Sequence, residues 1–147
     1  MPDGLPDPWF GSILAYAGYQ NAITHYRESL SINPDQPGPL SNLAWIFATH
    51  RMADVRNSDE AIRLSEQACQ LTEREDPRLL DTRAAAYASA GRFDKAIADM
   101  VQAIRLVGAD TEESVRQQYQ QRLTLYRNRR PYLETGSEKQ QTSSEAP

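Results

Sequence analysis

The chain holds one cysteine, no long apolar run and no excess of positive charge, and each of these absences excludes a class of protein. The lone thiol, Cys69, rules out an internal disulfide framework. Apolar and polar residues alternate throughout, and no stretch approaches the roughly 20 apolar residues that span a bilayer. The start, rich in proline and aspartate, lacks the basic residues of a secretory signal. We therefore expect a cytoplasmic protein that does not insert into a membrane.

Motifs for catalysis, metal binding and nucleic-acid binding are missing as well. The formal net charge of -4 gives no reason to expect nucleic acid or an acidic membrane as a partner. His25 and His50 have no cysteine or second histidine at ligand spacing, so we expect no metal and no cofactor. The sequence has no glycine-rich phosphate loop, nucleophile motif or HExxH pair. These absences predict that the protein is not an enzyme.

The sequence contains one helical pattern that occurs three times. Each copy begins with a small residue and an isoleucine, followed about one heptad later by another small residue with apolar neighbours. The copies start at Ala22, Ala61 and Ala96, so the two intervals are 39 and 35 residues long. A repeat at a fixed period of this length indicates a solenoid of stacked helix pairs.

The longer interval is explained by an insertion in the middle repeat. Leu43 precedes Ala61 by 18 residues, whereas Arg83 precedes Ala96 by 13, so five extra residues separate the two helices of that repeat. The sequence at 50–54 is largely polar, which predicts a mobile surface loop at this position.

Apolar spacing and the positions of proline and glycine predict seven helices and no strands. Six of these helices form three pairs, and the first pair includes a short helix over 9–17. The repeats are expected at about 9–36, 38–75 and 77–110.

Beyond the repeats, a seventh helix is expected over 111–129, where Asp110 and Glu113 would form a capping box. It carries an apolar stripe that would cover the exposed face of the last repeat; the stripe consists of Val115, Tyr119, Leu123 and Tyr126. The helical domain is expected to span 9–132. Residues 1–8 are expected to be irregular, and 133–147, which lack apolar periodicity, to form a disordered tail.

The third repeat places small and aromatic residues where the tetratricopeptide repeat (TPR) family has its signature, and the chain resembles this family. The matching residues are Ala84, Tyr87, Gly91, Phe93, Ala96 and Ala103. The repeat departs from the family pattern at Arg83, where an apolar residue is usual, and at Gly108, where proline is usual. The resemblance implies an all-α helix-turn-helix solenoid of about 2.5 repeats plus a C-terminal capping helix.

More narrowly, the chain resembles a bacterial TPR block that forms the C-terminus of larger proteins. The resemblance rests on the runs 42–49, 57–71 and 80–87 and on a closing phrase at 125–132. Small residues allow the paired helices to cross closely, and we expect Ala44 to meet Ala61 and Ala84 to meet Ala96. The fold does not specify a partner, because one solenoid serves many functions.

The resemblance places a binding groove on the inward face of the first helix of each pair. The groove residues are expected to be Ser41, Asn42, Trp45, Thr49, Arg78, Asp81, Thr82, Ala85 and Ser89. Some TPR proteins grip the terminal carboxylate of a peptide on this face, but only Asn42 and Arg78 match that scheme. An ordinary polar groove is therefore the favoured interpretation.

Several residues allow two interpretations. Trp45 is either an anchor for a partner or a residue covered by the insertion. Trp9 and Phe10 either pad the short first repeat or form an open edge. Four arginines lie near the end of the last helix: Arg122, Arg127, Arg129 and Arg130. They either bind phosphate or complement the helix dipole. The acidic net charge of the chain favours the helix-dipole interpretation.

These observations predict a non-catalytic module that binds a protein or peptide in its concave groove. Two alternatives remain open at this point. In the first alternative, the chain is the regulatory C-terminal part of a larger enzyme or membrane protein. In the second, it is a scaffold that self-associates through its N-terminal edge. The sequence identifies neither the partner nor the oligomeric state.

Overall fold

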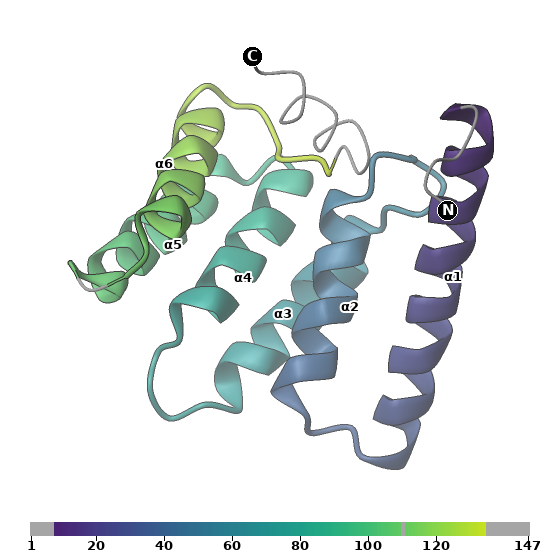
Figure 1. The fold of residues 1–147 in the computed structure, drawn as a ribbon. Coiled ribbons are helices and arrows are strands. Elements are labelled where there is room, and N and C mark those ends of the chain that lie inside the picture. The colour runs from purple at the N-terminus through teal and green to yellow at the C-terminus, as the bar shows by residue number, and fades with distance from the viewer. Residues whose placement is uncertain (1–7, 110, 135–147) are drawn as a thin grey trace.

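The computed structural model describes residues 8–109 and 111–134, with side chains from Gly18 onward. Within these residues the chain forms six helices and no strand (Figure 1). The helices are α1 (Pro8–Ile32), α2 (Pro37–Thr49), α3 (Ser58–Gln70), α4 (Pro77–Ser89), α5 (Phe93–Val107) and α6 (Glu113–Arg127).

Local sequence chemistry sets where these helices begin and end. Proline occupies the first turn of α2 and α4, where its missing N–H and fixed φ are no disadvantage. The side chain of Asn57 caps α3 by accepting from Glu60 N, and that of Asp76 caps α4 by accepting from Arg78 N. After α4 the chain reverses at Gly91, whose φ of 79° lies in the left-handed region that glycine adopts most readily.

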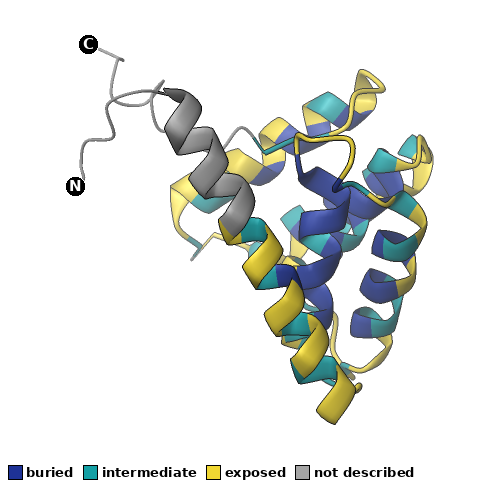
Figure 2. Ribbon diagram, turned by 90° about the vertical axis from the view of Figure 1, so that its right-hand side faces the viewer, coloured by how far each residue is buried: buried dark blue, intermediate teal, exposed yellow. Residues whose placement is uncertain are grey.

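The helices pack in two layers, with α2, α4 and α6 in front of α3 and α5 in the view of Figure 1. α2 packs on α3 and α4 packs on α5, and α4 also contacts both members of the preceding pair. Small residues fill the contacts: Ala44, Ala61, Ala84 and Ala96 are all fully buried. The expected all-helical, TPR-like solenoid is therefore confirmed. α1 lies at the edge of the stack and is mostly exposed beyond Gly18 (Figure 2).

The first repeat differs from the expected helix pair. The predicted break after residue 17 is wrong, because α1 continues from Pro8 to Ile32 as one helix of 25 residues. Only Gly18 stands at the expected turn, and a single glycine costs a helix about 1 kcal/mol relative to alanine, which is too little to end it. The described residues consequently form six helices where seven were expected, with two complete pairs between α1 and α6.

The insertion after α2 exposes residues 51–54 at the surface as expected, but His50 and Val55 on either side of them are buried. Val55 is buried at 7% exposure, and His50 is buried with its ring edge against Tyr19. The backbone of Asn57 donates to the carbonyl of Phe47, which ties the end of the loop to α2. Val55 is the buried apolar residue of this loop, whereas Met52 and Ala53 are exposed, and the sequence gives no signal that distinguishes them.

The last helix covers α5 as expected, but it begins differently. Tyr119, Leu123 and Tyr126 are buried, Val115 is half-buried, and α6 packs on α5. The expected capping box is wrong, because the N-cap is Glu112 and makes no side-chain capping bond. Asp110 lies outside the described residues. Leu133 and Glu134, which were assigned to a disordered tail, pack against the helices, and residues 135–147 lie outside the described residues.

Arg83, the departure from the TPR pattern in the third repeat, has a partner on the adjacent helix. Its Nε and Nη2 donate to the two carboxylate oxygens of Asp99 over 2.8 and 2.9 Å. This bidentate pair joins α4 to α5.

Candidate functional site

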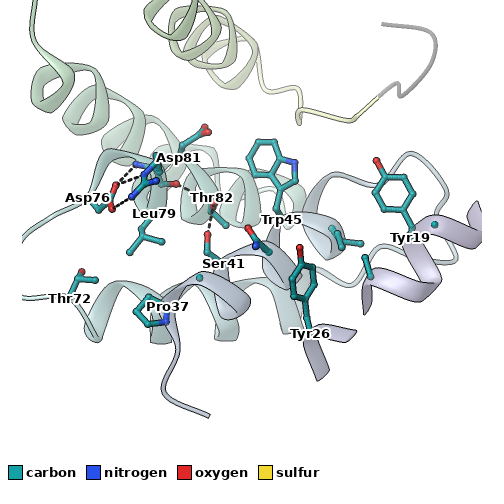
Figure 3. Close-up of a pocket in the computed structure, with 16 residues that line it drawn as sticks. Tyr19, Tyr26, Pro37, Ser41, Trp45, Thr72, Asp76, Leu79, Asp81 and Thr82 are labelled. Atoms are coloured by element: carbon teal, nitrogen blue, oxygen red, sulfur yellow. Dashed lines mark hydrogen bonds and ion pairs between the residues drawn. The ribbon is translucent and has the colours of Figure 1, made fainter. Parts of the chain in front are cut away.

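A groove of about 770 Å³ lies between α1, α2 and the start of α4 (Figure 3). It brings together six of the predicted groove residues; these are Ser41, Asn42, Trp45, Arg78, Asp81 and Thr82. The groove also takes in Tyr19 and Tyr26 of α1, which the sequence interpretation did not include. Both tyrosines follow the helical period of α1. A prediction of one long first helix would therefore have placed them beside the groove.

Ser41 and Thr82 form the floor of the groove. Ser41 Oγ donates to Thr82 Oγ1 over 3.0 Å, and Thr82 Oγ1 donates to the carbonyl of Arg78. Both side chains are buried. They join α2 to α4 where the two helices touch, and a partner in the groove would contact the walls on either side of them.

Asn42 and Arg78 lie on the exposed rim. Asn42 is exposed beside the groove, and Arg78 donates through Nε and Nη2 to the carboxylate of Asp76. The hydrogen bond from Arg78 lowers the pKa of Asp76 below its usual value. A partner's carboxylate would have to compete with Asp76 for this guanidinium, which disfavours the carboxylate-clamp interpretation.

The other wall of the groove is aromatic. Tyr19 and Tyr26 line it from α1, and Trp45 lines it from α2 (Figure 3). Burial raises the pKa of Tyr19 above its ordinary value, and the nearby carboxylate of Glu134 adds to the effect. Aromatic side chains with a polar tip are typical of peptide-binding surfaces, since they offer a large contact area and a hydrogen bond at once.

Asp81 and Arg122 form a buried ion pair at the upper end of the groove. Arg122 Nη1 donates to Asp81 Oδ2 over 2.7 Å, and both residues are buried. Burial raises the pKa of Asp81 to about 6, and the positive charge of Arg122 opposes this rise. Asp81 is therefore an internal partner of α6 more than a free carboxylate for a ligand.

The segment that follows α6 runs past the end of α4 toward the end of α2 (Figure 1). We call residues 131–134 the strap. The backbone of Glu134 donates to the carbonyl of Thr49 over 2.7 Å, and its carboxylate accepts from Trp45 Nε1 over 3.1 Å. The ring of Tyr132 lies 5.7 Å from the Trp45 ring. Neither Tyr132 nor Glu134 was predicted as part of the site, although Tyr132 stood in the closing phrase of the TPR resemblance.

Trp45 is thus covered on one side, but not by the insertion. The strap covers it, and the guanidinium of Arg122 lies 5.0 Å from the Trp45 ring and 4.7 Å from the Tyr132 ring. The side chain remains half-buried and also lines the groove. Trp45 is the residue that the groove and the strap share.

Three further predicted groove residues lie away from the hollow. Thr49 is buried at the end of α2, where its carbonyl holds the strap. Ser89 lies at the end of α4, and its carbonyl accepts from the Ser58 hydroxyl. Ala85 is buried within the helix stack. The inward face of each first helix therefore divides into a groove near its start and a packed region near its end.

The arginines expected to cluster at the end of α6 do not act together. Arg122 is buried with Asp81, whereas Arg127, Arg129 and Arg130 are exposed. Arg129 lies over the ring of Phe93, and its guanidinium is 3.9 Å from the carboxylate of Asp94. The phosphate-binding interpretation fails for Arg122 because its charge is already paired inside the protein.

Other candidate residues give no sign of a reactive site. Cys69 is half-buried, and burial raises the pKa of its thiol, so the nucleophilic thiolate is disfavoured. Among the described residues, no three histidine, cysteine, aspartate or glutamate side chains could jointly hold a metal ion. The side chains of Trp9 and Phe10, proposed as an open edge, lie outside the described residues.

No protein-family model matches the chain, and no solved structure matches it. The chain is similar in part to photosystem I assembly proteins. It is 39% identical over 54 residues to the photosystem I assembly protein Ycf3 of Synechococcus elongatus, and equally so to that of another Synechococcus strain. The matched segment covers 35% of this chain and 31% of each relative.

One finding bears on membranes. None of the described helices is long and apolar enough to cross a bilayer.

Proposed function

We propose that this chain is a non-catalytic module that binds a segment of another protein in the groove between α1, α2 and α4. The observation that carries the proposal is the convergence of six predicted residues on one hollow of about 770 Å³. A hollow of this size accommodates several side chains of a bound peptide. Aromatic walls supply contact area, and the exposed rim at Asn42 and Arg78 supplies hydrogen bonds that fix the register.

The relatives support an assembly role. They are described as assembly proteins, and a module that holds a protein segment is the kind of part that an assembly factor needs. Because the similarity spans 31% of those relatives, we propose the general role only, and no photosystem subunit as partner. The chain acts either by itself or as the binding part of a larger protein.

The remaining expectations from the sequence stay predictions. A cytoplasmic location and self-association through the N-terminal edge have no test in the described residues. The proposal specifies a protein or peptide as the partner, and it includes no nucleic acid and no cofactor.

The proposal is tested by selecting binding peptides from a displayed random library and then changing one exposed residue of the groove. Asn42→Lys places a long cation on the rim and should reduce the affinity of the selected peptides at least about tenfold, which corresponds to 1.4 kcal/mol. Asn21→Lys is the matched control, since Asn21 is an exposed residue of α1 that does not line the groove. Selected peptides that bind both variants equally well would place the binding surface elsewhere.

A further inference from the structure

The strap occupies a surface that has the composition of a peptide-binding site. Its floor is the Trp45 ring and the Arg122 guanidinium, and its end is the Thr49 carbonyl. Tyr132 and Glu134 fill this surface from the same chain. The strap therefore shows directly which chemical groups the surface accepts.

Two positions of the strap carry the recognition. The Tyr132 ring stacks on the Arg122 guanidinium at 4.7 Å, a cation–π contact that any aromatic side chain could make. The carboxylate of Glu134 accepts from Trp45 Nε1, and the backbone N–H of Glu134 donates to Thr49. An aromatic residue and a carboxylate two positions later satisfy all of these contacts.

The receiving surface is preorganised independently of the strap. Asp81 holds the Arg122 guanidinium from inside the protein, so the cation stays oriented toward Trp45 and Tyr132. Trp45 is carried on α2, whose neighbouring residues Ala44 and Ile46 are buried in the core. A surface built on fixed helices can accept a second segment without rearranging.

The strap lies at the surface and is not enclosed by the core. Tyr132, Leu133 and Glu134 are each partly exposed, and Pro131 is exposed. A separate hollow of about 500 Å³ remains between the strap and α6, lined by Leu125, Tyr132 and Leu133 among others. A surface segment that is open on one side separates at a lower free energy than a buried helix, so a competitor can replace it.

We propose that Trp45, Thr49 and Arg122 form a second peptide subsite, continuous with the groove through Trp45. Its ligand is a non-helical segment of a partner protein that carries an aromatic residue and, two positions later, an aspartate or glutamate. The strap fills the subsite until such a segment displaces it. This inference rests on the proposed function and specifies the chemistry of the partner.

The test uses a fluorescein-labelled, amidated peptide of residues 128–134, read by fluorescence anisotropy. The full chain with Tyr132→Ala and Glu134→Gln has an emptied subsite and should bind the peptide at least about tenfold more tightly than the parent, whose strap competes. A control peptide with the same two substitutions should not bind. Equal affinity of the peptide for both chains would contradict the proposal, as would no binding to a substituted chain that keeps its helical circular dichroism.

Two further measurements locate the peptide. Trp45→Phe in the emptied chain keeps a ring but removes the Nε1 donor, so the chain should no longer prefer a glutamate peptide over its glutamine analogue. In the unsubstituted parent, an excess of spin-labelled peptide should broaden the indole N–H resonance of Trp45, so the test does not depend on the folding of any variant. An unaffected resonance would overturn the proposal.

The outcomes also separate this inference from the groove. Asn42→Lys is tested with the library-selected peptides, whereas the strap substitutions and Trp45→Phe are tested with the strap peptide, so either proposal can fail alone. Sedimentation of the parent should show a monomer. A dimer that the strap substitutions abolish would assign the subsite to a second copy of the chain and overturn the choice of a different protein as ligand.

Discussion

Arg122 of α6 reaches across 41 residues of sequence to Asp81 of α4, and its Nη1 lies 2.7 Å from Asp81 Oδ2. The same guanidinium lies over the rings of both Trp45 and Tyr132. One side chain therefore joins α4, α2, α6 and the strap. Asp81 Oδ1 and Arg122 Nε are buried and make no hydrogen bond within the described residues, so the pair is only partly compensated for its removal from water.

This ion pair leads to a prediction about stability. Arg122→Met leaves Asp81 buried without its cation and should lower the free energy of unfolding by about 3–5 kcal/mol. Replacing both residues, with Asp81→Leu and Arg122→Met, should cost less than Arg122→Met alone. Urea unfolding of the parent, Arg122→Met and the double variant measures these differences in stability. Arg78→Met is the exposed control and should change the free energy of unfolding by less than about 1 kcal/mol. A double variant with a lower free energy of unfolding than Arg122→Met would contradict this prediction.

The raised pKa of Asp81 predicts a pH dependence. Its pKa is about 6 in the folded state, against an ordinary value of 3.8. Between these values the folded state holds a proton that the unfolded state releases, so the contribution to stability is complete below the ordinary pKa and is lost as pH rises through about 6. The parent should gain about 1 kcal/mol between pH 7 and pH 5 relative to Asp81→Asn, as measured by urea unfolding. Parallel pH profiles would show that Asp81 titrates normally.

The close crossing of α4 and α5 predicts the effect of a larger side chain. Ala96 has no exposed surface, so Ala96→Leu should overpack the crossing and lower the free energy of unfolding by about 1–3 kcal/mol. Ala98→Leu, on the exposed side of α5, is the matched control and should be nearly neutral. Chemical denaturation compares the two. Equal midpoints for both variants would mean that the helices at Ala96 are not tightly packed.

The packed insertion makes a prediction opposite to that for a free loop. Val55→Ala removes two buried carbons and should cost about 1–2 kcal/mol, whereas Met52→Ala in the same loop should cost much less because Met52 is partly exposed. Deletion of residues 51–55 should destabilise the fold further. Thermal unfolding by circular dichroism measures all three. A deletion variant as stable as the parent would restore the interpretation of a loop without a packing role.

The turn that leads into the strap offers a stabilising substitution. Arg129 has a φ of 58°, and the backbone N–H groups of Arg129 and Arg130 donate to Tyr126 and Leu125, as glycine-terminated helices do. Because a residue with a Cβ is strained there, Arg129→Gly should raise the free energy of unfolding by roughly 1 kcal/mol. Arg127→Gly, within α6, should lower it by a similar amount. If Arg129→Gly also lowers it, the contacts of Arg129 with Phe93 and Asp94 outweigh the strain.

Much of the fold follows from local pattern. The alanines at 61 and 96 repeat at the spacing of stacked helix pairs, and the prolines at 37 and 77 mark helix starts. Gly91 marks a turn that needs a left-handed backbone. These features act over a few residues, so the sequence alone reveals them. The continuity of α1 does not follow from local pattern in the same way, because the first repeat carries few of the residues that mark the later ones.

Part of the candidate site was predictable for the same reason. The TPR resemblance predicts the inward face of each first helix, and Asn42, Trp45 and Arg78 of that face line one hollow. The role of Asp81 was not predictable, because its partner Arg122 lies on a different helix and no local pattern connects them. The strap was missed because four residues without periodicity give no signal for packing.

The sequence by itself determined the helices, their order and the small residues at their crossings, because backbone preference and side-chain period are properties of short segments. Only the tertiary structure decided which polar side chains line the groove and which face one another. Arg122 carries the same charge as Arg127 and lies on the same helix, yet one is buried against Asp81 and the other is exposed. That difference arises from the fixed separation of α4 and α6, which exists only when the whole stack has formed.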